Sequence, residues 1–162
     1  MKSKSKLTHA NLSGADLRGA DLKGVHLEGA HLGAIFTAPY NPGGANLSDA
    51  NLNRATLAGA NLVECNLQGA DLRSANLRNA ILGDSNLKGA NLQNADLTDA
   101  SLKYSDLTDT NLRGANLQNT DFQEAKNLTS AQVKAAKNWN KAHYNPDLRK
   151  QLGLPPEMKK HY

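Results

Sequence analysis

Residues 45–64, with the sequence ANLSD-ANLNR-ATLAG-ANLVE, contain the pattern that decides the fold. A leucine stands at the third position of each pentapeptide, and an alanine stands two residues before it. The residue directly before the leucine is Asn in three of the pentapeptides and Thr in the other, ATLAG. The working unit is therefore Ala-(Asn/Asp)-Leu-x-x, and a fixed internal period is the first signal to follow in any chain.

The same unit extends in both directions from this stretch. Leucine recurs every five residues from Leu7 to Leu32 and again from Leu47 to Leu117, and Phe122 takes the last position. Of these 22 centres, 15 have Ala two residues earlier, and nothing larger than Val stands there. Asn or Asp directly precedes 16 of the centres. One repeat phase thus runs through most of the 162 residues.

A period of five excludes both regular elements. On an α-helix successive leucines would be separated by about 140° and would spread over every face. On a flat strand an odd period would send them to alternate faces. If each pentapeptide is instead a short extended side followed by a bend, all leucines and small residues point to one interior. The sides then wind into an all-β solenoid whose coils pair about 4.8 Å apart.

These residues resemble the pentapeptide-repeat family, whose motif is A(D/N)LXX, and they are similar to its leucine-centred cyanobacterial members. The resemblance covers roughly residues 5–125. It implies a right-handed quadrilateral parallel β-helix with four repeats, or twenty residues, in each coil. It also implies that the central leucine and the small residue before it face inward, while the other three positions face solvent.

Residues 33–44 interrupt the repeat with two prolines and a Gly-Gly pair, which are turn signals. Because Leu27 and Leu47 are twenty residues apart, we predict one complete coil with an irregular side, in which Phe36 takes a central position. The segment is either a distorted corner without a role or an exposed recognition loop. The candidate loop residues are Pro39, Tyr40, Asn41 and Pro42.

The C-terminal part is predicted to form a short α-helical cap on the last coil, whose edge would otherwise template further pairing. Thr129 and Gln132 fit a capping box, so a helix should begin near Ser130. Continued helical periodicity through His143 would turn an apolar face, including Trp139, toward the last coil. The cap residues are Leu128 and Val133, which would form a hydrophobic staple, and Trp139.

A second short helix is expected to start at Asn145-Pro146 and stop at Gly153. The expected organisation is a basic tail at 1–6, the β-helix at 7–125, the helical cap at 126–153 and a polar tail at 154–162. The net charge differs along the chain. Residues 1–6 carry +3, residues 7–125 carry −5, and the cap and polar tail together, residues 126–162, carry +6. The positive net charge therefore comes from the two ends of the chain, and the β-helix itself is acidic.

Stacking the repeats by twenties sorts the surface into columns. The column beside Leu62, Leu82, Leu102 and Phe122 mixes apolar and acidic groups, which the repeat does not require, so we predict a protein-contact surface there. The alternative is that isolated apolar side chains on a surface are ordinary. The candidate residues are Val63, Glu64, Ile81, Asp84, Tyr104 and Glu124. The column beside Leu52, Leu72, Leu92 and Leu112 presents Arg54, Arg73 and Arg113 with Asp71.

Nothing in the sequence points to catalysis, a cofactor or a metal. An enzyme needs converging polar groups in a concave site, whereas the repeat fills the interior with Leu and Ala. Cys65 stands at the inward small position, where it reads as a buried spacer. His26 and His31 precede successive centres, which places them on adjacent sides and apart from one another.

The sequence therefore favours a non-catalytic scaffold that binds another, unidentified protein. The family resemblance raises one alternative, a DNA mimic that binds a type II topoisomerase such as gyrase and protects it from quinolones, which would need a strongly acidic rod. Direct nucleic-acid binding through Lys134, Lys137 and Lys141 is a weaker alternative. With no signal peptide or membrane span in the sequence, we expect a cytoplasmic monomer or weak dimer.

Overall fold

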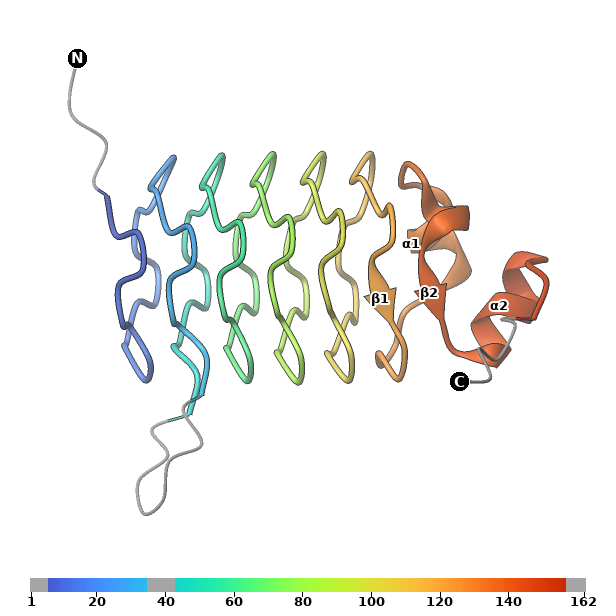
Figure 1. The fold of residues 1–162 in the computed structure, drawn as a ribbon, viewed down its shortest axis with the longest axis horizontal. Helices are drawn as coiled ribbons and strands as arrows, with labels where there is room; N and C mark the ends of the chain where they lie inside the picture. Colours follow the sequence, from blue (N-terminus) through green and yellow to red (C-terminus); the bar gives the residue numbers. More distant parts are fainter. Residues whose placement is uncertain (1–5, 35–42, 157–162) are drawn as a thin grey trace, which may run out of the picture.

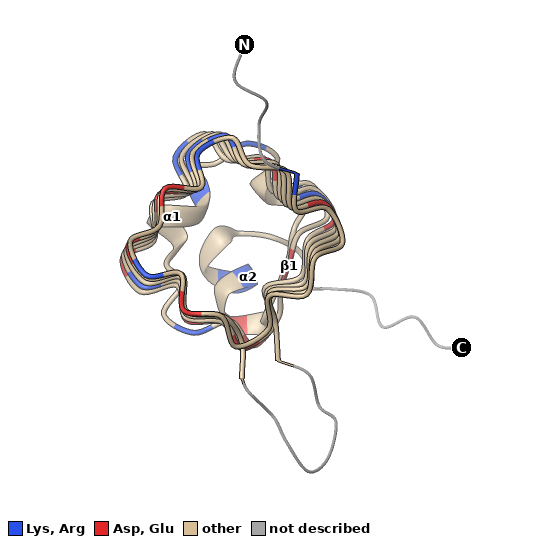
Figure 2. Cartoon of the chain, turned by 90° about the vertical axis from the view of Figure 1, so that its left-hand side faces the viewer, with Lys and Arg blue, Asp and Glu red and all other residues tan. Residues whose placement is uncertain are grey.

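The chain winds as a four-sided solenoid that ends in a small helical region (Figure 1). The structure is a computed structural model and describes residues 6–34 and 43–156. Viewed along its axis, the solenoid has a four-sided outline with successive coils in register (Figure 2). Each side pairs with the next coil through a single-residue parallel bridge, followed by a two-residue turn.

We name the sides A to D in the order in which the first coil passes through them. The bridged residues that define each side are Lys6, His26, Thr56, Asn76, Asp96 and Asn116 on side A; Asn11, His31, Asn61, Ile81, Ser101 and Asp121 on side B; Asp16, Asn46, Asn66, Asn86 and Asp106 on side C; and Asp21, Asn51, Asp71, Asn91 and Asn111 on side D. The turn after each side is called the corner of that side.

The segment at 33–44 is an insertion, and the predicted twenty-residue coil is wrong at this point. His26 bridges Thr56, so this coil takes thirty residues, and Asp16 bridges Asn46. The chain leaves the coil after Leu32 and returns at Ala45, whose N–H donates to the Leu32 carbonyl at 2.7 Å. The ten extra residues equal two repeats, so they leave the phase of the leucines unchanged. Phe36 lies outside the described residues.

The interior is a continuous stack of leucines and small residues. The central leucines from Leu27 to Leu117 are at most 1 % exposed, and Phe122 closes the stack. Where Ser or Thr replaces the inward alanine, its hydroxyl is satisfied inside: Ser85 donates to the Leu82 carbonyl at 2.7 Å and Thr110 to the Leu87 carbonyl at 2.8 Å. These inward hydroxyls therefore have partners, as a packed interior requires, whereas Glu28 Oε2 at the A corner is a buried oxygen without one among the described residues.

The Asn or Asp before each leucine has two structural tasks. Its side-chain oxygen accepts the N–H two residues later, as Asn66 Oδ1 does from Gln68 at 3.2 Å. Where this residue is Asn, its amide also joins the coils, because Asn86 Nδ2 donates to Asn66 Oδ1 at 3.2 Å and Asn66 Nδ2 donates to Asn46 Oδ1 at 3.1 Å. This double use explains why the repeat prefers Asn and Asp at a position outside the core.

The two ends of the stack differ. In the first coil, the leucines at 7, 12, 17 and 22 are only partly buried against the core. At the other end, α1 (Ser130–Lys134), η1 (Trp139–Lys141) and α2 (Pro146–Leu152) follow the last coil. Val133 is fully buried there, while Leu128 and Trp139 are partly buried against the core.

The prediction of one helix continuing through Trp139 to His143 is wrong. Helix α1 has its capping box at Thr129 and Gln132, but it ends at Lys134 after five residues. The backbone beyond it instead extends the ladders of the solenoid: Lys137 bridges Asn116 on side A. On side B, strand β2 (His143–Tyr144) pairs in parallel with β1 (Asp121–Phe122). Pairing with the last coil thus outweighs helix continuation in this segment.

Helix α2 lies beyond the last coil, at the C-terminal end of the solenoid (Figure 1), and falls within the four-sided outline in the view along the axis (Figure 2). Asn145 is its N-cap and accepts the Leu148 N–H at 2.8 Å, and Gly153 ends it with φ 72°. Leu148 and Leu152 turn inward and belong to the core cluster. None of the helices formed by residues 6–34 and 43–156 is long and apolar enough to cross a membrane.

Candidate protein-interaction surface

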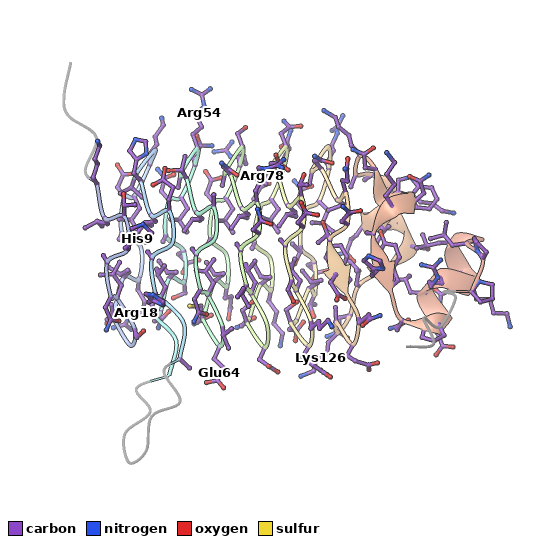
Figure 3. The ribbon with its side chains drawn as sticks, viewed as in Figure 1. His9, Arg18, Arg54, Glu64, Arg78 and Lys126 are labelled. Carbon is purple, nitrogen blue, oxygen red and sulfur yellow. The ribbon has the colours of Figure 1, made fainter. Side chains whose placement is uncertain are left out.

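The B corner joins side B to side C and contains most of the candidate residues. Its turns from the third coil onward are Val63-Glu64, Gly83-Asp84, Lys103-Tyr104 and Gln123-Glu124. Glu64, labelled in Figure 3, extends away from the solenoid at the lower edge of that view. The structure thus stacks Glu64, Asp84, Tyr104 and Glu124, which are far apart in sequence, at one position of successive coils, and all four are exposed.

The backbone at this position disfavours the residues that occupy it. In the regular turns from His9 to Glu124 the second residue is left-handed, with φ between 54° and 70°. Glycine adopts this conformation freely, Asn and Asp tolerate it, and other L-residues pay on the order of 1 kcal/mol. Six residues of the regular turns belong to this last class, and three of them lie at the B corner, where Glu64, Tyr104 and Glu124 have φ of 58°, 62° and 57°; the others are His9 at the A corner and Arg54 and Ser74 at the D corner. The fold alone does not account for these residues.

Ile81 departs from the repeat in a second way. It stands at the Asn/Asp position of side B, where its side chain can neither accept the Gly83 N–H nor join the amide ladder. It is 49 % exposed, as is Tyr104, and these are the exposed large hydrophobic residues of the described chain. Val63 is half-buried, so it contributes less to the surface than the sequence suggests.

The carboxylates of the B corner differ from those on the sides of the solenoid, many of which form ion pairs. Among residues 6–34 and 43–156, Glu64, Asp84 and Glu124 form no ion pair. Several side carboxylates do: Asp71 meets Arg73 at 2.6 Å, and that guanidinium holds the pKa of Asp71 below its usual value. Other pairs are Asp16 with Arg18, Asp96 with Arg78, Asp106 with Lys88 and Asp121 with Lys103.

At its C-terminal end, the B corner opens into a groove that sequence reasoning missed. The groove has a volume of about 820 Å³ and lies between the turn at Gln123-Glu124 and helix α2. Its lining includes Tyr144, whose ring stacks on Phe122 with centroids 5.7 Å apart and whose hydroxyl donates to the Trp139 carbonyl at 2.7 Å. The remaining lining residues are Asn145, Pro146, Arg149, Lys150, Gly153, Leu154 and Pro156.

The groove is shaped by the C-terminal segment, which explains why the repeat gives no sign of it. Arg149 donates from Nε and Nη2 to the Pro155 carbonyl at 3.0 and 2.6 Å, which holds the chain after α2 against the helix. Lys150, also on α2, is exposed. Glu124 belongs to both the corner and the groove, so the two form one continuous surface.

The insertion meets the B corner at its other end. The Ala34 N–H donates to the Val63 carbonyl at 2.9 Å. A Cβ atom on Gly33 would lie 2.6 Å from the Val63 nitrogen, and one on Gly44 would lie 2.6 Å from the Glu64 carbonyl carbon. Glycine is therefore required where the insertion leaves and rejoins the coil. The candidate loop residues Pro39, Tyr40, Asn41 and Pro42 lie outside the described residues.

The groups that could carry chemistry are held in structural contacts. Cys65 is buried, burial raises the pKa of its thiol to about 12, and its Sγ donates to the Leu32 carbonyl at 3.2 Å. Glu28 contacts Thr56 Oγ1 at 2.7 Å and His26 Nδ1 at 3.1 Å on side A. No group of three or more His, Cys, Asp or Glu residues within 6–34 and 43–156 is placed to hold a metal ion.

Comparison with known proteins agrees with the repeat architecture. A family model for pentapeptide repeats matches eight copies, over residues 3–33, 45–84, 90–126 and 100–136. A pentapeptide repeat protein from the thylakoid lumen of Arabidopsis thaliana is 29 % identical, with 76 % of this chain and 74 % of that chain covered and a TM-score of 0.59. No curated protein sequence matches the chain.

Two further solved structures are similar at lower TM-scores. HetL, a pentapeptide repeat protein involved in heterocyst differentiation regulation in the cyanobacterium Nostoc, is 31 % identical, covers 87 % of this chain and 68 % of its own, and has a TM-score of 0.47. QnrB1, a plasmid-mediated fluoroquinolone resistance protein, is 16 % identical over 93 % of this chain and 95 % of its own, with a TM-score of 0.42. Because the family model matches well over half of its residues, the chain belongs to the pentapeptide-repeat family.

Proposed function

We propose that this protein is a non-catalytic scaffold that binds another protein through the B corner. One observation carries the proposal: Glu64, Tyr104 and Glu124 occupy left-handed turn positions that favour Gly, Asn or Asp. Residues held in disfavoured backbone conformations concentrate at functional positions, because the surrounding structure must compensate for them. Ile81 adds to this, since it replaces a ladder residue with an exposed apolar side chain.

The solenoid is suited to this role because its repeats hold the corner rigid. Each coil is bonded to the next on all four sides, so the turn residues are fixed in a column by backbone hydrogen bonds of 2.7 to 3.4 Å. Because these residues are already fixed, the solenoid loses little conformational entropy when a partner binds. A preorganised surface binds more tightly for the same contacts.

The charge distribution argues against the DNA-mimic alternative. A mimic would present free carboxylates along its sides, whereas Asp71, Asp96 and Asp121 on sides D, A and B each contact a Lys or Arg. Duplex DNA carries one negative charge per about 1.7 Å of axis. The B corner carries three free carboxylates over four coils, which at about 4.8 Å per coil is far sparser.

Site-specific photocrosslinking tests the proposal. A photoreactive phenylalanine analogue would replace Tyr104 in one sample and Asn94, at the same turn position of the D corner, in a control. We expect a discrete protein adduct from position 104 in cells of the source organism, and we expect unmodified protein to compete it away while the Ile81→Asn/Tyr104→Asn variant does not. Equal adducts at the two positions, or none at position 104, would remove the basis for the proposal.

A further inference from the structure

We infer that the B corner and the adjoining groove bind an amphipathic helix of the partner, with Lys or Arg residues along one edge and an apolar anchor at one end. This inference rests on the proposed function and names the chemistry of the partner. Three observations point to it: free carboxylates at a fixed spacing, two exposed apolar side chains beside them, and a groove at one end of the same surface.

The carboxylates provide the charge complementarity. Glu64, Asp84 and Glu124 stand at one position of their coils and form no ion pair within residues 6–34 and 43–156. Of the cations around this corner, Lys103 is held by Asp121 at 3.0 Å and Lys88 by Asp106 at 3.3 Å, while Lys126 follows Glu124 by two residues. Three coils at about 4.8 Å each place Glu64 and Glu124 about 14 Å apart. Three turns of an α-helix, about 16 Å, present basic side chains at a similar spacing.

The apolar side chains favour a helix that is amphipathic rather than merely basic. Ile81 and Tyr104 are each 49 % exposed, and they come from successive coils between Glu64 and Glu124. A helix places residues i, i+3, i+4 and i+7 on one face, so apolar residues at these positions can cover both side chains while basic residues beside them meet the carboxylates.

The groove accounts for the anchor and for the direction of the helix. Tyr144, Pro146 and Leu154 line it with apolar surface, and its volume of about 820 Å³ admits a large side chain. Lys150 lies on its α2 wall. Because the C-terminal end of a helix is partially negative and its N-terminal end partially positive, the favourable orientation points the partner's C-terminal end toward Lys150 and its N-terminal end toward Glu64.

The test is a selection with a random sixteen-residue peptide library displayed on phage and panned against the full-length protein. We expect selected peptides to combine Lys or Arg with Leu, Phe or Trp at helical spacing. Chemically synthesised copies should lose at least tenfold in affinity for a variant with Glu64→Gln, Asp84→Asn and Glu124→Gln. They should lose as much for Gln123→Trp, which fills the groove, and binding should weaken as salt rises.

Two matched controls use the same repeat positions elsewhere. Asp49→Asn, Asp99→Asn and Asp109→Asn change the net charge equally at left-handed turn positions of the A and C corners. Gln118→Trp places the same side chain at the first turn position of the A corner, away from the groove. We expect both controls to bind the selected peptides within twofold of the unmodified protein.

The outcomes separate this inference from the proposed function. Selected peptides that need Ile81 and Tyr104 but are neutral or acidic, and that ignore the carboxylate variant, would overturn the basic helix and leave the interaction surface standing. Peptides that bind every B-corner variant as well as the unmodified protein would overturn both. Basic, apolar peptides that respond to the carboxylate variant and to Gln123→Trp, but to neither control, support the inference.

Discussion

The regular turns of the B and C corners are built by the same repeat and differ only in their side chains. The C corner places Asp49, Gly69, Gly89 and Asp109 at the left-handed position, whereas the B corner places Glu64, Asp84, Tyr104 and Glu124 there. The C corner holds the residues that this backbone favours, and at Gly69 a side chain would collide with the Asp49 carboxylate. The comparison shows that the repeat does not require the B corner side chains, which is the basis for the interaction surface that we propose there.

The interior beneath the B corner should respond most strongly to substitution. Leu102, two residues before Tyr104, is fully buried, so Leu102→Ala leaves a cavity and should lower the free energy of unfolding by about 2–5 kcal/mol. Chemical denaturation measures this. A loss of less than half a kcal/mol would contradict the division between a structural interior and a functional corner.

The ladder position offers a reciprocal pair of substitutions. Asn86→Ile removes the acceptor of the Lys88 N–H and the donor to Asn66, and it should cost about 1–3 kcal/mol. Ile81→Asn on side B should supply the two bonds that Asn makes elsewhere, by accepting the Gly83 N–H and donating to Asn61. The free energy of unfolding should rise by about 1 kcal/mol. Thermal unfolding of the two variants checks this, and a loss of stability in Ile81→Asn would mean that Ile81 is structural.

The insertion can be removed as a unit. Deleting residues 34–43 joins Gly33 to Gly44 and restores a regular Leu-Gly-Gly-Ala-Asn unit with a twenty-residue coil. The connection between Leu32 and Ala45 becomes ten residues shorter, so less entropy is lost when its ends are brought together. We therefore expect a gain of about 1–2 kcal/mol in the free energy of unfolding. Limited proteolysis should find the first coils as resistant as before. Rapid cleavage within residues 6–32 would show that the insertion supports the stack.

Glu28 is a carboxylate that forms hydrogen bonds within the solenoid, to Thr56 and His26. The Thr56 hydroxyl, and then His26, hold the pKa of Glu28 at about 2, against 4.5 for the free group. Because this pKa is lowered by folding, its stabilisation is complete above about pH 4.5 and is lost as pH falls toward 2. Thr56→Val should raise the pKa, which an NMR titration of Glu28 measures, and an unchanged value would contradict the role of Thr56.

The sequence predicts the interior well because a period of five leaves one geometric solution for the leucines. It could not count the residues in the insertion coil, since ten extra residues preserve the phase and make Leu27 and Leu47 look like successive coils. It places the start of α1 correctly but not its end, because the pairing of Lys137 with Asn116 depends on the last coil rather than on helix propensity.

The sequence alone predicts which residues align in the B corner, but it does not predict that their backbone is left-handed. Counting coils in steps of twenty from Leu62 aligns Glu64, Asp84 and Glu124 correctly. The left-handed backbone at these positions is a property of the turn, and the only signal of it in the sequence is that Gly, Asn and Asp occupy most of the other turns. The groove depends on where α2 packs, which local sequence patterns do not encode.

The free energy of unfolding of the variant with Glu64→Asn, Tyr104→Asn and Glu124→Asn tests the central claim most directly. If these residues serve a partner at the expense of the fold, Asn should relieve the three left-handed turns and raise the free energy of unfolding by about 1–3 kcal/mol in denaturant titrations. A variant that is instead 1 kcal/mol or more less stable would show that the B corner side chains hold the solenoid together, which would contradict the account.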